Sequence, residues 1–251
     1  MWFIDADDFI SCNILKMLRG HLADAKTEVL QFGTYTLQDE FSPTEKKSYE
    51  NGELNPKSFA NNVFVTRSIF KKAFLKQHGI TFYTELSYSE DKVFVSEVLS
   101  KNPYVKKIRN TCYFYRYHTG SIITQENSLD VNRRVYMRSF AVSRLREAYT
   151  ASSATYRVVL ADNLMSEVYH CFYTICGLPS DRYRETKRKL MADGLLSIRR
   201  PKECTLQRSY LVDHSTISGK IFDFVFIRLD SDIGRTMMRC IRLANRIRKK
   251  A

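Results

Sequence analysis

The chain has 251 residues, and 44% of them are hydrophobic, which is enough to bury the core of one large domain and excludes whole-chain disorder. The formal net charge of +13 is uneven: residues 1–125 carry 16 basic and 14 acidic groups, and residues 126–251 carry 24 and 13. A uniformly basic nucleic-acid binder would not have a nearly neutral first half. The charge therefore predicts two regions with different roles, 1–125 and 126–251, and no nucleic-acid partner.

The cysteines and the apolar segments indicate where the protein works. Six cysteines form no C-x-x-C pair and no Cys/His set with zinc spacing, so we expect reduced thiols in a cytoplasmic protein. No apolar run reaches the ~20 residues of a membrane span. The apolar start ends at Ile4, which is too short for a signal peptide.

The chain opens on an apolar segment, Met1–Ile4, that runs directly into Asp5, Asp7 and Asp8. This pattern predicts the end of a buried strand followed by a loop rich in carboxylates. A buried strand needs neighbours on both sides, so either this strand pairs only with later segments or the chain lacks its natural beginning. We expect the second.

The remaining pattern predicts a mixed α/β region followed by a mainly helical one. The predicted elements are a helix over Cys12–Ala23, a strand over Glu28–Leu37, a loop over 38–58, a helix over Arg67–Gln77 ended by His78-Gly79, a helix over Ser89–Ser100 and a strand over Lys107–His118. From about residue 128 the pattern is helical, with interruptions near Ser152-Ser153, Gly177-Leu178-Pro179, Pro201 and Ser218-Gly219.

The first candidate site is the sequence Asp-Ala-Asp-Asp at 5–8. Carboxylates one residue apart after a strand can hold a divalent cation whose other ligands are phosphate oxygens. A solvated acidic turn is an equally good interpretation. A phosphatase of the haloacid-dehalogenase type also opens with D-x-D, but it usually has a small residue where this chain has Phe9, so we set it aside.

The second candidate is Ser89-Glu90-Asp91 at the start of a predicted helix. A carboxylate in the first turn is stabilised in its charged form by the helix dipole and can act as a general base. Ordinary capping of the helix explains the same residues.

The third candidate is the extended segment 112–122, CYFYRYHTGSI. Its alternation places Phe114, Arg116 and His118 on one face, where Arg116 and His118 can meet a diphosphate or a metal. An aromatic edge strand with a solvated arginine is the simpler alternative.

The order of these motifs resembles the inverting glycosyltransferases of family 2, which have the GT-A fold. The resemblance covers residues 1–123: an apolar strand into D-x-D-D, the segment NNVFVTRSIFKKAFLKQHGITF, E-D at a helix start and Y-x-Y-R-x-H-x-G-S-I. It implies an incomplete GT-A, Rossmann-like mixed sheet in 1–125, followed by a helical region. The usual opening strand with V-S-V-I-I-P-x-Y-N and the D-D-G-S motif do not occur, and Ser89 stands where glycine is common.

The resemblance implies a role for each matching residue. Asp5 and Asp7 would hold the donor and its Mn²⁺ or Mg²⁺, with His118 as a further metal contact and Arg116 at the leaving diphosphate. The roles of Asp91 and Glu90 would be general base and acceptor positioning. The partners would be a nucleotide-sugar donor and a saccharide or lipid-linked acceptor, in surface polysaccharide or glycolipid synthesis. A truncated, non-catalytic remnant or partner subunit stays open as the alternative.

The last segment, Asp232–Lys250, places apolar and basic residues on opposite faces of a predicted helix. Such a helix can lie on an anionic membrane, which would make the protein peripheral on the inner face of the cytoplasmic membrane. A terminal helix packed on its own domain explains the pattern equally well. Tyr169, Phe172 and Tyr173 are predicted as helix core.

Overall fold

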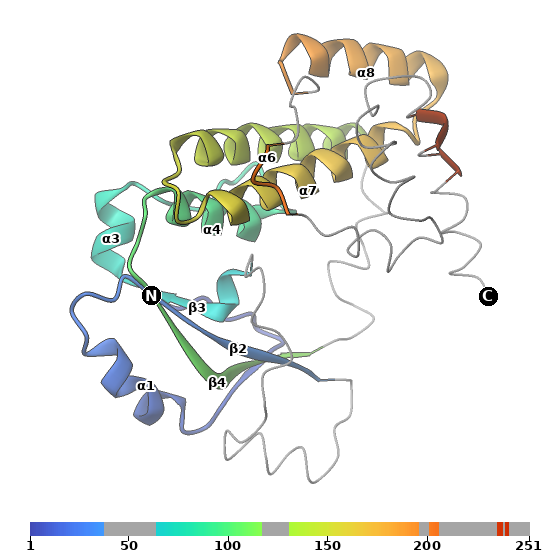
Figure 1. The fold of residues 1–251 in the computed structure, drawn as a ribbon. Helices are drawn as coiled ribbons and strands as arrows, with labels where there is room; N and C mark the ends of the chain where they lie inside the picture. Colours follow the sequence, from blue (N-terminus) through green and yellow to red (C-terminus); the bar gives the residue numbers. More distant parts are fainter. Residues whose placement is uncertain (38–63, 117–130, 196–200, 206–234, 238, 241–251) are drawn as a thin grey trace. The chain divides into compact units, whose positions relative to one another are not determined.

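The computed structural model describes residues 1–37, 64–116, 131–195, 201–205, 235–237 and 239–240 (Figure 1). The chain divides into two compact units. The first unit comprises residues 1–83 and 91–129, and the second comprises residues 84–90 and 130–251. The architecture is mixed α/β, because the described strands belong to the first unit and the long helices follow them along the chain.

The first unit contains a four-stranded mixed sheet with the order β1-β4-β2-β3. Its strands are β1 (Phe9–Ile10), β2 (Val29–Leu37), β3 (Ser68–Phe70) and β4 (Val105–Arg116). β2 and β4 run side by side and parallel (Figure 1). β1 pairs antiparallel with β4, and β3 pairs antiparallel with β2. The strands expected over Glu28–Leu37 and Lys107–His118 are confirmed as far as Arg116. The edge-strand interpretation of 112–122 is wrong for its described part, because β4 has a neighbour on each side.

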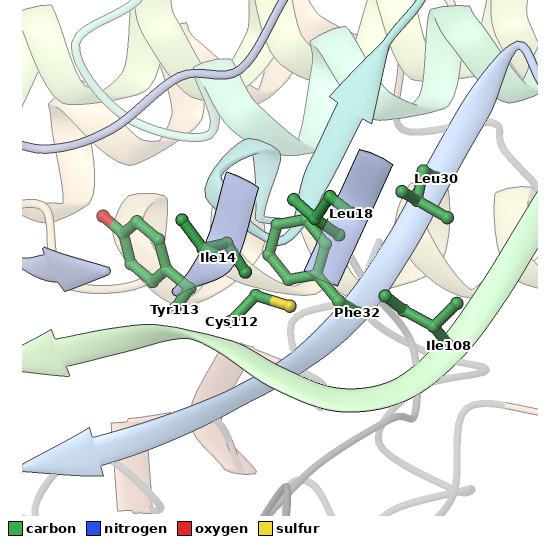
Figure 2. Close-up of a cluster of buried hydrophobic side chains, with 7 residues drawn as sticks. All are labelled: Ile14, Leu18, Leu30, Phe32, Ile108, Cys112 and Tyr113. Carbon is green, nitrogen blue, oxygen red and sulfur yellow. The ribbon is translucent and has the colours of Figure 1, made fainter. Parts of the chain in front are cut away.

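The core of this unit lies between the sheet and the helix α1 (Ile14–Leu22). Figure 2 shows the cluster, which consists of Ile14, Leu18, Leu30, Phe32, Ile108, Cys112 and Tyr113. The predicted helix is confirmed, and two of its leucines lie outside the core, Leu15 exposed at 74% and Leu22 at 46%. At 100° per residue, both are turned by about 80–100° from Ile14, whereas Leu18 is turned by only about 40°.

The opening segment does not form the predicted buried strand. Trp2 makes a single bridge to Ile69, and the backbones of Met1 and Phe70 exchange hydrogen bonds. Met1 and Ile4 are each about half exposed. The segment thus lies along β3 through a single antiparallel bridge, and its apolar side chains are only partly buried.

The segment predicted as one helix over Arg67–Gln77 contains three elements. A 3₁₀ turn, η1 (Val65–Arg67), leads into β3, and the helix α3 (Lys72–Gln77) follows. The expectation was wrong for 68–70 because pairing with β2 buries Ser68 and Phe70, and local spacing cannot show such pairing. The predicted stop is confirmed: Gly79 has φ +62, which glycine adopts without steric cost.

The helix α4 (Glu90–Ser100) is confirmed within one residue of the prediction. Its Phe94 packs against Phe3, Phe70 and Phe82 with ring centroids 4.5–5.5 Å apart. These aromatic contacts connect the helix to β3 and to the opening segment. They fix the start of α4 relative to the sheet of the first unit.

The second unit is built on three helices, α6 (Val131–Ala151), α7 (Arg157–Ile175) and α8 (Ser180–Ala192). α6 and α7 pack side by side (Figure 1). The interruptions predicted near Ser152-Ser153 and 177–179 are confirmed, and Tyr169 and Phe172 are buried as expected. Tyr173 is half-buried.

Only a part of the predicted helix 232–250 lies among the described residues. Residues 235–237 and 239–240 are helical, and the Arg235 guanidinium lies 4.0 Å from the centre of the Tyr183 ring. The basic side of this segment therefore meets the second unit at Arg235.

No helix in the described part of the chain is long and apolar enough to cross a membrane. The predicted loop 38–58 and the break at Ser218-Gly219 lie outside the described residues.

Candidate functional site

The aspartates at 5–8 form a tight turn at the edge of the sheet. The Asp8 amide donates to the Asp5 carbonyl at 3.2 Å, and β1 begins at the next residue. The Asp5 side chain is exposed, and Asp7 and Asp8 are partly exposed. We call residues 5–8 the acidic turn.

Two residues near the end of β4 attach the acidic turn to the sheet. The Tyr113 hydroxyl donates to Asp8 Oδ2 at 2.5 Å and accepts from the Asp5 amide at 3.2 Å. The Arg116 amide donates to Asp8 Oδ1 at 2.9 Å. Figure 2 shows the Tyr113 ring at the edge of the core cluster with its hydroxyl pointing away from the cluster. Asp8 therefore shapes the turn, and both of its carboxylate oxygens are already bound.

The acidic turn lies at the carboxyl ends of two parallel strands. β2 and β4 end in register, with Leu37 opposite Arg116. In open α/β sheets, ligands bind in the crevice outside the carboxyl ends of the strands. The turn is held at this edge by the Arg116 amide, so its carboxylates occupy the position where a ligand is expected.

The electrostatics of the turn disfavour its own charge. Burial, followed by the charges of Asp8 and Asp7, raises the pKa of Asp5. Burial also raises the pKa of Asp8, although the hydrogen bonds from Tyr113 and Arg116 oppose the rise. Burial and the bond to Asp8 raise the pKa of Tyr113, so its hydroxyl stays protonated as a donor. A cation at the turn would relieve the repulsion between these carboxylates.

Arg116 is the cationic residue closest to the turn along β4. Its guanidinium lies 5.6 Å from the centre of the Phe9 ring, which belongs to β1 next to the turn. The side chain is partly exposed. A positive charge at this position is available to an anionic ligand at the carboxyl edge.

Asp91 is held separately, at the start of α4. Its Oδ2 accepts the Val65 amide of η1 at 3.1 Å, which fixes the carboxylate relative to the first unit. Glu90 is partly exposed and belongs to the segment 84–90 of the second unit. Ser89 has φ +62, a conformation that costs a residue other than glycine roughly 1–2 kcal/mol.

The predicted site residues thus fall into separate groups. Asp5 and Asp7 lie in the turn that Asp8 attaches to β4 by accepting a hydrogen bond from the Arg116 amide. Asp91 belongs to a separate group, because its carboxylate accepts a hydrogen bond from the Val65 amide. His118 lies outside the described residues. Sequence analysis missed the roles of Asp8 and Tyr113. Asp8 carried a weak signal, because a residue three after Asp5 closes a turn, but nothing local indicated a contact with a residue 105 positions away.

The chemistry of the turn fits a cation that brings most of its own ligands. The described residues contain no cluster of three or more His, Cys, Asp or Glu side chains arranged for a metal ion. Mg²⁺ is often held by only one or two carboxylates, with phosphate oxygens and water completing its shell. Asp5 and Asp7 are the two carboxylates of the turn that could serve in this way, and Asp8 accepts hydrogen bonds from Tyr113 and Arg116.

Of three comparisons with known proteins, one found similar structures. No protein-family model matches it, and neither does any curated protein. Among solved structures, it is similar to S. aureus TarS 1–349 at 12% identity and a TM-score of 0.43, covering 86% of this chain and 67% of that one. The complex of TarS 1–349 with UDP-GlcNAc gives 13% identity and a TM-score of 0.44, and the complex with UDP gives 12% identity and a TM-score of 0.40. Each match covers 86% of this chain and 68% of the other. The site is therefore interpreted below from its own residues.

Proposed function

We propose that the chain is a glycosyltransferase that moves a sugar from a nucleotide-sugar donor to an acceptor hydroxyl, as in surface polysaccharide or glycolipid synthesis. The observation that supports it best is the attachment of the acidic turn to the carboxyl end of β4 by Tyr113 and Arg116. The order of Asp5, Asp7, Asp91 and Arg116 along the chain agrees with the family 2 pattern described above.

In this proposal, the acidic turn binds the donor diphosphate through a divalent cation. Asp5 and Asp7 would hold Mn²⁺ or Mg²⁺, and the bound ion would supply positive charge to the diphosphate. Asp8 would keep the turn in place through its two hydrogen bonds. His118 would add a further contact to the metal or the diphosphate, as the resemblance implies.

The transfer itself would be a single displacement. The Asp91 carboxylate would accept the proton of the acceptor hydroxyl while that oxygen attacks the anomeric carbon of the donor. The bond from the anomeric carbon to the diphosphate oxygen breaks, and its electron pair leaves with the nucleoside diphosphate. The Arg116 guanidinium would stabilise the developing negative charge. Attack opposite the leaving group inverts the anomeric configuration, and Glu90 would orient the acceptor.

The experiment that tests the donor site is calorimetric titration of the full chain with UDP, with and without Mn²⁺. We expect binding that requires the metal and is lost in Asp7→Ala. The matched control is Asp24→Asn, because Asp24 lies 3.7 Å from Lys106 near the amino end of β4, far from the turn. This control should bind as the unaltered chain does.

A panel of nucleotides completes the test, because another base is an alternative donor. GDP, CDP and dTDP would be titrated in the same way. Failure of all four nucleotides to bind, with and without Mn²⁺, would contradict the proposal. Binding that Asp7→Ala leaves unchanged would contradict the assignment of the site to the acidic turn.

A further inference from the structure

The residue just before Glu90 and Asp91 has an unusual backbone that its surroundings must hold. Ser89 lies in the left-handed region with φ +62. Residues other than glycine keep such a conformation only where neighbouring groups hold it. The Ser89 hydroxyl donates to Glu167 Oε2 at 2.9 Å and accepts from Arg138 Nη1 at 3.0 Å. Ser89 is therefore anchored to α6 through Arg138 and to α7 through Glu167.

The two anchoring side chains form a buried ion pair. Arg138 Nη1 and Glu167 Oε1 are 2.6 Å apart, and their side chains are 11% and 0% exposed. Cys171, one turn further along α7, shares this dry environment, and burial raises the pKa of its thiol to about 12. Hydrogen bonds in such surroundings are strong and hold their partners in one geometry.

Helix packing alone does not require this pair. Well-packed apolar side chains of similar volume stabilise a helix interface as well as, or better than, a buried ion pair. Apolar side chains in these two positions would leave the Ser89 hydroxyl without its two partners. The charged pair thus does something that apolar packing cannot, which is to fix a polar group at the end of segment 84–90.

We propose that Arg138 and Glu167 are positioning residues, which hold Ser89 in its left-handed conformation and thereby fix the backbone that leads into Glu90, the first residue of α4. Glu90 and Asp91 are the first two residues of that helix. Neither Arg138 nor Glu167 acts on a substrate, because both act through Ser89. The catalytic purpose of this geometry rests on the proposed function, whereas the geometry itself can be tested without a substrate.

The first test compares Ser89→Gly with Ser89→Ala by hydrogen exchange at the amides of residues 89–93 in the full chain. Both substitutions remove the hydroxyl, but only alanine retains the steric cost of a positive φ. We expect exchange in Ser89→Ala to be faster by about tenfold and exchange in Ser89→Gly to stay within about threefold of the unaltered chain. Equal exchange in the two variants would overturn the proposal.

The second test changes the ion pair. Glu167→Gln removes the charge that Arg138 needs, and the double variant Arg138→Leu, Glu167→Leu replaces the pair by apolar side chains that keep the helices packed. Both should raise exchange at 89–93 by about tenfold. The matched control is Leu164→Ala, also buried in α7, which removes packing without touching a partner of Ser89. If the double variant folds and leaves exchange at 89–93 unchanged, or if Leu164→Ala changes it equally, the proposal is wrong.

A kinetic comparison then separates this proposal from the proposed function. If the chain transfers a sugar, Glu167→Gln should lower kcat and leave the KM for the donor unchanged, because the acidic turn is intact. An unchanged kcat together with faster exchange would overturn the positioning role. A chain that binds no nucleotide would refute the proposed function, and the exchange results would still decide whether the ion pair holds the backbone at Ser89.

Discussion

The two units hold their carboxylates in opposite ways, one buried and paired, the others grouped at a partly exposed turn. In the second unit, Glu167 is fully buried and meets Arg138 at 2.6 Å. In the first unit, Asp5, Asp7 and Asp8 lie together, and burial and neighbouring carboxylates raise the pKa of Asp5 (through Asp8 and Asp7) and that of Asp8 (through Asp7). The paired carboxylate supports the structure, whereas the grouped carboxylates cost free energy until a cation or a proton neutralises them. Uncompensated charge of this kind is typical of functional sites.

The largest expected effect concerns the proposed base. Asp91→Asn should lower the transfer rate by roughly 10²–10⁴-fold, the usual contribution of a general base. Binding of the nucleotide should change little, because the acidic turn is not altered. The measurement is a single-turnover assay beside titration of the nucleotide. The matched control is Glu97→Gln on the same helix, where Glu97 accepts a hydrogen bond from the Tyr83 hydroxyl. Normal turnover in Asp91→Asn would refute the assignment of Asp91 as the general base.

A second prediction compares the two groups of carboxylates directly. Glu167→Ala leaves Arg138 buried without a counter-charge, so the free energy of unfolding should fall by about 3–5 kcal/mol. Asp7→Ala removes one of several repelling charges, so the change should stay within about 0.5 kcal/mol. Urea denaturation measures both values. Losses of similar size would show that the acidic turn is held for stability and would break the comparison.

The attachment of the turn to β4 is tested by Tyr113→Phe. This substitution keeps the buried ring but removes the donor to Asp8 and the acceptor for the Asp5 amide. The free energy of unfolding should fall by about 1–3 kcal/mol, since the Asp8 carboxylate loses a partner. Tyr104→Phe, at an exposed position before β4, is the control and should be neutral within the error of thermal denaturation. A neutral Tyr113→Phe would show that the turn is not fixed by this hydroxyl.

The smallest effect is a dependence of stability on pH. The pKa of Asp5 is raised in the folded chain above its ordinary value of 3.8, so the folded state binds the proton more tightly than the unfolded state. Stability should therefore fall as the pH rises from about 3.8 through the raised pKa and stay constant above it. Denaturation measured across this window in the unaltered chain and in Asp5→Asn isolates the contribution. The two profiles should differ in slope there, and identical slopes would contradict the raised pKa.

Much of the fold was predictable because a strong hydrophobic periodicity indicates a helix or a strand from the local sequence alone. The strands β2 and β4 and the helices α1 and α4 lie within a few residues of the expected ranges. The failure at 68–70 has a definite cause: the apolar spacing of Ser68-Ile69-Phe70 suits a helix or a strand, and the long-range pairing with β2 decided it. Pairing between distant segments leaves no local signal.

The candidate site was predictable in its residue types and less so in its arrangement. The sequence pointed to residues 5–8, to Asp91 and to Arg116, but it did not show that Tyr113 and Asp8 hold the turn. The spacing of α7 contained a further signal. Glu167 falls on the same side of the helix as Leu160, Leu164 and Cys171, which are all buried, so its carboxylate lies on the apolar side of the helix. A charged residue there predicts a buried partner, although only the structure identifies Arg138.

The most direct test of the central claim is to locate Mn²⁺ by paramagnetic broadening in NMR spectra of the full chain with UDP. β4 serves as an internal ruler, because Arg116 and Lys106 are ten residues apart, on the order of 30 Å along an extended strand. We expect loss of the amide signals of residues 5–9 and 113–116, and little change at Lys106 or Asp24. Uniform broadening, or broadening centred away from residues 5–9, would contradict a cation site at the acidic turn.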